Sequence, residues 1–286
     1  MNRSITLMLL TTALFMSLQA QAHRAWMLPS ATVLSGEAPW ITVDAAVSND
    51  LFYFEHFPML LEGVGTPGET AGRQRQPAQL LILAPDGSRL HPLNGNIGRL
   101  RSSFDLELTQ KGTYKLAIAS EARVSASYML DGERQRWMGD LDKITEEIPA
   151  NAESLDVTRT ENRMEVFVTS GNLTESVFSI TGQGLELQPV THPNDLFSGE
   201  PARFQFLLDG QPASGLDVTV VPGGNRYRDD LGDMHLQTNA DGIVEILWPT
   251  PGMYWLEAEY SSSEGLSPPL NRRRASYSST LEVLAP

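Results

Sequence analysis

Arg203-Phe204-Gln205-Phe206-Leu207 alternates polar and apolar side chains. Successive side chains of a strand point to opposite faces of a sheet, so this period of two predicts a strand buried on one face. Similar runs occupy 113–118 and 163–168. Turn sequences such as Asp209-Gly210 and Asp241-Gly242 separate these runs, because glycine readily takes the positive φ of tight turns. Short strands joined by such turns predict an all-β protein.

Two short motifs occur twice, in the same order. Gly36-Glu37 and Gly199-Glu200 each precede a predicted strand, and Gly112-Thr113-Tyr114 is matched by Gly252-Met253-Tyr254. This repeat predicts two tandem Ig-like β-sandwich domains, residues 23–184 and 185–286. A single large, irregular sandwich is the alternative. Helix is expected only in short pieces, such as one within 140–148.

Composition excludes several classes of function. The chain has 286 residues, 35 acidic and 21 basic side chains, a formal charge of −14 and no cysteine. Nucleic-acid binding requires a basic face, so we expect no nucleic-acid partner. Without cysteine there are no disulfides, thiolate metal sites or cysteine nucleophiles.

The first 22 residues have the three parts of a secretory signal peptide. Arg3 provides the positive start, residues 5–16 are apolar, and Ala20-Gln21-Ala22 fits a cleavage site. The apolar run is shorter than the ~20 residues that a membrane-spanning helix needs. We therefore predict cleavage after Ala22 and a periplasmic mature chain that starts at His23 and does not span the membrane.

A mature chain that starts at His23 has two nitrogen donors on one residue, the α-amine and the imidazole. Together they can chelate a divalent transition metal such as nickel, cobalt or copper. The third residue, Ala25, is not the histidine of the amino-terminal copper/nickel motif. A second side chain is therefore needed to complete the site.

His56 is the first candidate for that side chain. Glu55, His56 and Met59 provide oxygen, nitrogen and sulfur donors within one aromatic-rich segment that includes Phe52, Phe54 and Phe57. Such aromatics would fix the loop and exclude water from the ligands. The alternative is an aromatic loop that packs on the sandwich, with His56 as a hydrogen-bonded member.

His235 is the next candidate, since Asp229, Asp230 and Asp233 lie close to it in the sequence. A solvated acidic loop is the alternative interpretation. The segment 63–68 fits the dinucleotide pattern G-x-G-x-x-G, but Pro67 would stand in the phosphate turn, so we reject that motif. No nucleophile elbow, H-E-x-x-H or P-loop is present, and we predict no enzymatic activity.

The motifs at both ends of the chain resemble those of a family of exported bacterial β-sandwich proteins of unknown function, labelled periplasmic components of cobalt or nickel transport. Ala22-His23-Arg24-Ala25-Trp26-Met27-Leu28-Pro29 resembles the A-H-x-x-W-x-x-P opening of that family. Residues 184–190, Asp209-Gly210-Gln211-Pro212, 238–242 and 251–256 are similar to its later motifs. The resemblance implies a periplasmic accessory protein of metal uptake, with His23 as a ligand.

The sequence thus predicts a metal-binding accessory of nickel or cobalt uptake, with copper or iron as other possible metals. Its partners would be the metal ion and a membrane transporter or outer-membrane receptor. One alternative is a metal-free structural or receptor-partner β-sandwich module. A less favoured alternative is a His-brace copper enzyme, which would need a flat substrate face near Trp26 or Trp40.

Overall fold

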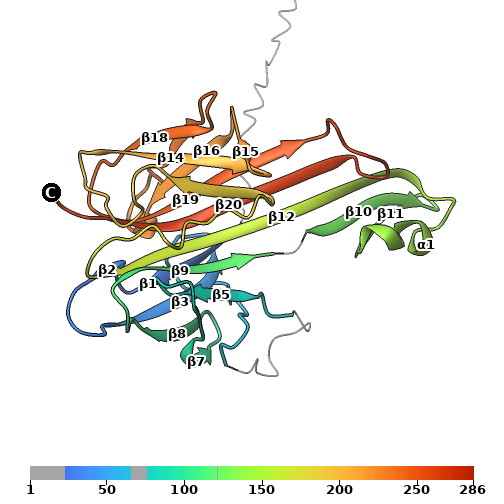
Figure 1. Ribbon diagram of the computed structural model, residues 1–286. Helices are drawn as coiled ribbons and strands as arrows, with labels where there is room; N and C mark the ends of the chain where they lie inside the picture. Colours follow the sequence, from blue (N-terminus) through green and yellow to red (C-terminus); the bar gives the residue numbers. More distant parts are fainter. Residues whose placement is uncertain (1–22, 66–75, 121) are drawn as a thin grey trace, which may run out of the picture.

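The computed structural model describes residues 23–65, 76–120 and 122–286. The all-β prediction is confirmed: these residues form twenty strands, and their helical structure consists of two short 3-10 turns and α1 (Ile144–Glu147) (Figure 1). The helical window 140–148 is also confirmed, because η1 (Leu141–Lys143) and α1 lie within it. The predicted signal peptide, residues 1–22, lies outside the described residues.

The N-terminal half contributes one antiparallel sheet. Its strands run in the order β1 (Arg24–Pro29), β3 (Trp40–Ser48), β8 (Ser102–Glu107) and β7 (Leu93–Ile97). The short β4 (Phe57–Pro58) pairs with the last part of β3, beyond the residues that β8 covers. Both β1 and β4 therefore flank the same end of β3, which places the segments just before them close together.

A larger sheet runs through both halves of the chain. Its main path is β17 (Met234–Gln237), β16 (Asp217–Pro222), β19 (Gly252–Ser262), β20 (Arg272–Val283), β12 (Glu153–Ser170), β9 (Gly112–Ala119), β5 (Leu80–Leu83) and β6 (Arg89–Leu90). β2 (Val33–Leu34) also pairs with the end of β12. The long β12 pairs in parallel with β20 and antiparallel with β9, so it joins the two halves.

The third sheet covers the C-terminal part of the large one. It comprises β13 (Leu185–Pro189), β14 (Pro201–Leu208), β15 (Gln211–Pro212) and β18 (Ile243–Leu247). Phe204 and Phe206 of β14 point inward and pack with Tyr277 and Leu256 of the large sheet. These residues are buried, which makes this layer a β-sandwich with its own core.

Two large cores correspond to the two halves. One gathers buried residues from Met27 to Val168, and the other gathers mainly residues from Leu185 to Val283, together with Phe167 and Val177. A smaller cluster joins the halves by packing Trp26 against Trp255 and Val221. Because β12 and β20 share one sheet, the division into domains 23–184 and 185–286 remains a prediction.

An arm built on a β-hairpin and the first part of β12 extends from the body (Figure 1). β10 (Arg123–Leu130) and β11 (Glu133–Gly139) form a hairpin, and β10 pairs with the first part of β12. One face of the arm packs with α1 through Val124, Ala126, Ile144, Ile148 and Val157. Trp137 Nε1 also donates a hydrogen bond of 2.8 Å to Glu147 Oε2, which ties β11 to α1.

Candidate functional site

The end of β3 brings together two histidines that are far apart in the sequence. His23 lies just before β1 and His56 just before β4, and both strands pair with β3 at Val47. The centroids of the two imidazole rings are 4.2 Å apart, with an interplanar angle of 48°. The structure therefore places the two predicted histidine ligands side by side.

His56 has an unusual hydrogen-bonding state. Its Nε2 atom is buried and has no hydrogen-bond partner among the described residues. Burying a polar atom without a partner costs free energy, so buried polar groups are nearly always paired. An unpaired, buried ring nitrogen beside a second imidazole fits a site that is completed by a bound ion.

The loop before His56 is held by several contacts. Trp26 is completely buried, donates a hydrogen bond of 2.8 Å from Nε1 to Ser48 Oγ, and packs against the rings of Phe52 and Phe54. Glu55 Oε1 accepts hydrogen bonds from the backbone N–H groups of Asn49, at 2.6 Å, and Asp50, at 2.8 Å. The structure thus uses this oxygen of Glu55 to fix the loop, whereas the sequence had suggested a ligand.

His235 lies on a different strand, β17. Its Nε2 atom is 2.8 Å from Asp233 Oδ2, and its side chain is 73% exposed. Among the described residues, no three His, Cys, Asp or Glu side chains are grouped so that they could hold a metal ion. The structure therefore brings the rings of His23 and His56 together, while Oε1 of Glu55 and Nε2 of His235 contact other groups.

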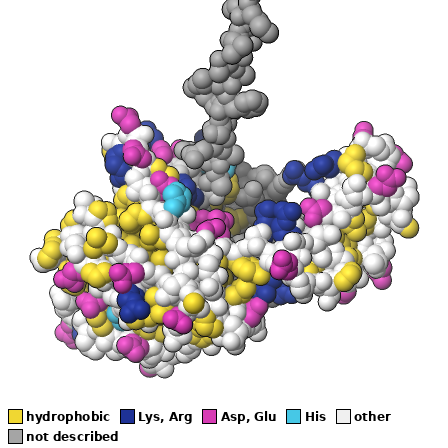
Figure 2. All heavy atoms as spheres, turned by 90° about the horizontal axis from the view of Figure 1, so that it is seen from above, with side chains coloured by type: hydrophobic (Ala, Val, Ile, Leu, Met, Phe, Trp, Pro, Cys, Tyr) yellow, Lys and Arg dark blue, Asp and Glu magenta, His cyan; other side chains and the backbone are white. Residues whose placement is uncertain are grey.

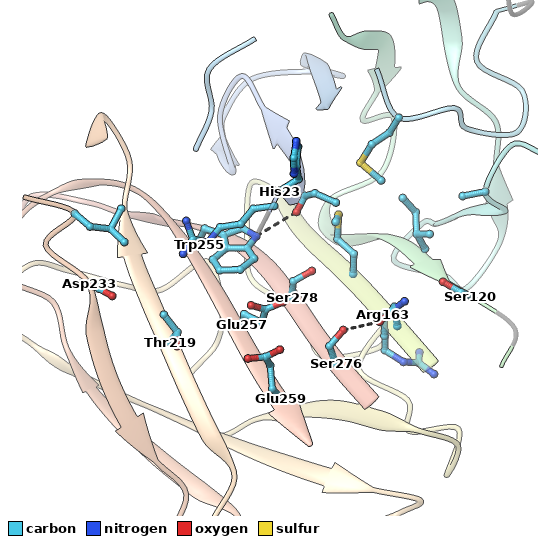
Figure 3. Close-up of a pocket in the computed structure, with 18 of the residues that line it drawn as sticks. His23, Ser120, Arg163, Thr219, Asp233, Trp255, Glu257, Glu259, Ser276 and Ser278 are labelled. Carbon is cyan, nitrogen blue, oxygen red and sulfur yellow. Dashed lines mark hydrogen bonds between the residues drawn. The ribbon is translucent and has the colours of Figure 1, made fainter. Parts of the chain in front are cut away.

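A cleft of about 730 Å³ opens beside His23, and sequence reasoning missed it. Its floor is one face of the large sheet, where strand register aligns His235, Thr219, Glu257, Ser278 and Met164 across five strands. Figure 3 shows His23 above Trp255, with Glu257, Glu259, Ser276 and Ser278 on the strands below. The polar floor and His23 therefore belong to one concave region.

Glu257 is the titratable group that this cleft perturbs most clearly. Burial, together with the negative charge of Glu259, raises the pKa of its carboxyl group to about 7, and the nearby charge of Arg24 opposes that shift. The Arg24 guanidinium lies 5.3 Å from the centroid of the Trp255 ring. Trp255 Nε1 also donates a hydrogen bond of 3.2 Å to the carbonyl oxygen of Ala25, so the start of β1 is attached to the cleft floor.

The sequence contained a weak signal for this floor. Leu256 and Ala258 are buried, while Glu257 and Glu259 alternate with them and point to the other face. Alternation alone predicts a strand with one polar face. It does not show that this face is covered by the N-terminal half, because that depends on how β12 and β20 join the two halves.

A family model named Domain of unknown function (DUF4198) matches residues 20–262. The chain belongs to this family. The family resemblance noted from the sequence is therefore correct at the level of a family of unknown function, and the match says nothing about cobalt or nickel. No curated protein matches the DUF4198 chain.

Solved structures similar to this DUF4198 chain are distant. The D0-D1 domain of intimin is 10% identical, covers 90% of this chain and 97% of its own, and has a TM-score of 0.21. A Salmonella alpha-2-macroglobulin reacted with methylamine is 12% identical over 92% of this chain, with a TM-score of 0.21. An Escherichia coli alpha-2-macroglobulin activated by porcine elastase is 11% identical over 93% of this chain, with a TM-score of 0.19. This chain spans 15% and 31% of those two structures, and similarities of this size carry no functional information.

No helix in the described part of the DUF4198 chain is long and apolar enough to cross a membrane.

Proposed function

We propose that this DUF4198 protein is a periplasmic, metal-binding accessory of divalent-metal uptake, and that His23 and His56 bind the ion. The observation that carries the proposal is the pairing of the two imidazoles, with Nε2 of His56 buried and unpaired. Two imidazoles bound about 90° apart on one ion, at metal–nitrogen distances of ~2.0–2.1 Å, would have centroids ~4.5 Å apart. The observed separation of 4.2 Å is close to that value.

The third donor would be the α-amine of His23. No further His, Cys, Asp or Glu of the described chain is grouped with the pair, so another donor has to come from the main chain or from solution. Cleavage after Ala22 would create an amine on the residue that already carries one of the imidazoles. A chelate formed by one residue loses little additional freedom on binding, and this favours affinity.

The donor set favours particular metals. Two imidazoles and an amine are nitrogen donors that suit nickel, cobalt, copper and iron better than calcium or magnesium, which prefer oxygen. The proposed role is binding and delivery without catalysis, and the recipient would be a membrane transporter or an outer-membrane receptor. The acidic surface of the chain, with a formal charge of −14, would attract cations to the site.

Isothermal titration with nickel and copper on four proteins tests this proposal. The proteins are the chain that starts at His23, the same chain with one glycine added before His23, His56→Ala, and His235→Ala, which removes an exposed histidine of the cleft floor that the proposal does not use as a donor. We expect the glycine extension and His56→Ala each to weaken binding by about tenfold or more, since each removes one donor. The His235→Ala variant should bind as the parent does.

Two outcomes would overturn the proposal. Equal affinity in the first three proteins would exclude the α-amine of His23 and the imidazole of His56 as ligands. Absence of binding in the parent would favour a metal-free structural or receptor-partner module.

The enzyme alternative has less structural support. Trp26 is completely buried, so it cannot contribute to a flat substrate face. Trp40 is 48% exposed but begins β3, while the histidines lie at the other end of that strand. At ~3.3 Å per residue, the length of β3 separates Trp40 from the pair by ~25 Å.

A further inference from the structure

One face of the arm and its base carries five arginines. Arg134 and Arg136 lie on β11, Arg123 on β10, and Arg272 and Arg274 on β20. Register places them on the same face of the sheet, because directly paired residues share a face. The pairs that show this are Arg123 with Thr160, Thr160 with Arg274, Thr158 with Arg272, Ser125 with Thr158, Ser125 with Met138, and Ser127 with Arg136.

These five arginines, which we call the arginine face, lack ion-pair partners. None of them forms a salt bridge with a described residue, although the chain has 35 acidic side chains. Three neighbouring arginines do: Arg159 and Arg273 pair with Glu161, and Arg163 pairs with Glu165. These three arginines are paired with carboxylates, whereas the arginine face is left available.

The arginine face looks outward. The opposite face of the arm is occupied by its own small core, in which Val124, Ala126 and Val157 pack against α1. Figure 2, which views the molecule from above, shows Lys and Arg side chains gathered where the arm joins the body. Because the core and the Trp137–Glu147 hydrogen bond hold the arm, its arginines are displayed on a stiff support.

The composition of this face is typical of a protein-binding surface. Arginine and methionine are enriched at protein interfaces and lysine is depleted, and Met138, on the same face, is 72% exposed. The short hydroxyl side chains of Ser125, Thr158 and Thr160 lie among the arginines on this face. Guanidinium groups with room around them can bind carboxylates in a bidentate manner.

Two features favour a protein partner over a membrane surface. Asp156 pairs with Ser127 and Glu153 pairs with Met129, so both carboxylates lie on this face, near the tip of the arm. A plane of lipid phosphates would repel them, whereas a single chain can follow the arginines and avoid them. β11 also pairs only with β10 in the described structure, so its outer edge is open to strand addition by an extended segment.

We propose that the arginine face of the arm is a docking surface for an extended, acidic segment of a partner protein. An added strand would bond to the backbone of β11 and place its carboxylates near Arg134 and Arg136. Carboxylates beyond that strand would reach Arg272 and Arg274 at the base of the arm. This surface acts independently of the metal site, so the two proposals can fail separately.

The test is fluorescence anisotropy of a labelled octaglutamate peptide with the chain that starts at His23. Two double variants remove charge from the face, Arg134→Gln with Arg136→Gln, and Arg272→Gln with Arg274→Gln. The matched control, Arg99→Gln with Arg203→Gln, removes the same charge at exposed positions elsewhere. We expect saturable binding that each double variant weakens by about tenfold and that the control changes by less than about twofold, with a steep loss as salt rises.

Three results would overturn the proposal. One is no binding of the peptide at low salt. Another is an equal loss in the control, which would show that net charge alone attracts the peptide. The last is that the protein binds vesicles rich in phosphatidylglycerol but not the peptide, and that the two double variants weaken this vesicle binding. That result would assign the surface to a membrane.

Discussion

Tyr114 and Tyr254 make the same pair of side-chain-to-backbone hydrogen bonds, one tyrosine in each half of the chain. The Tyr114 hydroxyl donates to the carbonyl oxygen of Gln110 at 2.9 Å and accepts from the N–H group of the same residue at 2.7 Å. The Tyr254 hydroxyl does the same with Thr250, at 2.7 Å and 3.3 Å. Both are tyrosine corners, a feature of Greek-key β-sandwiches, and they explain the repeated Gly-x-Tyr motif.

Replacing either tyrosine with phenylalanine should destabilise the fold. Tyr114→Phe and Tyr254→Phe each leave a backbone donor and acceptor without the hydroxyl partner, at a cost of about 1–3 kcal/mol. The free energy of unfolding from urea titration, followed by tryptophan fluorescence, measures this. Tyr227→Phe is the control, since Tyr227 is 85% exposed and should change stability little. Full stability in both corner variants would contradict the structural role of the corners.

The sequence was sufficient to predict the strands and the helical window, because both depend on local periodicity and turn residues. The segment 203–207 is part of β14, and 113–118 is part of β9. Two features were not predictable from local pattern. The pairing of β12 with β20 joins distant segments, and the arm forms because β10 pairs with an early part of β12 that the sequence does not distinguish from its later part.

Glu257 should make stability depend on pH in a direction opposite to that of most carboxylates. Its pKa is raised to about 7 in the folded chain, from an ordinary value of 4.5, so the folded state holds the proton more tightly. Stability therefore falls as pH rises from about 4.5 to about 7 and is constant above that range. Glu257→Gln, which stays neutral, should be more stable than the parent by about 1–3 kcal/mol at about pH 8.

At about pH 5 the stability of Glu257→Gln should be closer to that of the parent, because Glu257 is then protonated and neutral in the folded parent. Urea unfolding of the two proteins at both pH values provides the measurement. Glu200→Gln is a suitable control because Glu200 is exposed and lies outside the cleft. A stability difference between Glu257→Gln and the parent that does not change with pH would rule out the shifted carboxyl group as its cause.

Glu55 should support the histidine pair by ordering the loop. Glu55→Ala removes the acceptor for the N–H groups of Asn49 and Asp50, and loss of such a supporting contact typically weakens metal affinity about 10–100-fold. Glu55→Gln keeps an oxygen at that place and should retain most of the affinity. Nickel titration of both variants distinguishes a role in ordering the loop from a role as a metal ligand. Equal losses of affinity in Glu55→Ala and Glu55→Gln would indicate that the Glu55 carboxylate itself binds the ion.

The candidate site could be predicted from the sequence only in part. The positions of His23 and His56 near a predicted cleavage site and among aromatics were sufficient to name both as candidate ligands. That they meet depends on β1 and β4 flanking one end of β3, which is a matter of register. The cleft floor was missed for the same reason, because Glu257 and Ser278 become neighbours only through the pairing of β19 with β20.

Metal affinity should fall as pH is lowered. Both imidazoles and the α-amine of His23 bind a metal only in their unprotonated forms, so protons compete with the ion at each donor. We expect affinity for nickel to fall by about tenfold or more between about pH 8 and about pH 6, and the dependence to be shallower in His56→Ala, which has one donor fewer to deprotonate.

Titration calorimetry in buffers of different ionisation enthalpy gives both the affinity and the number of protons released. His235→Ala should release as many protons as the parent, because the ring of His235 contacts Asp233 and is not one of the proposed donors. If the parent and His56→Ala release equal numbers of protons, the ion is bound without the His56 imidazole, and the pair is a packing contact.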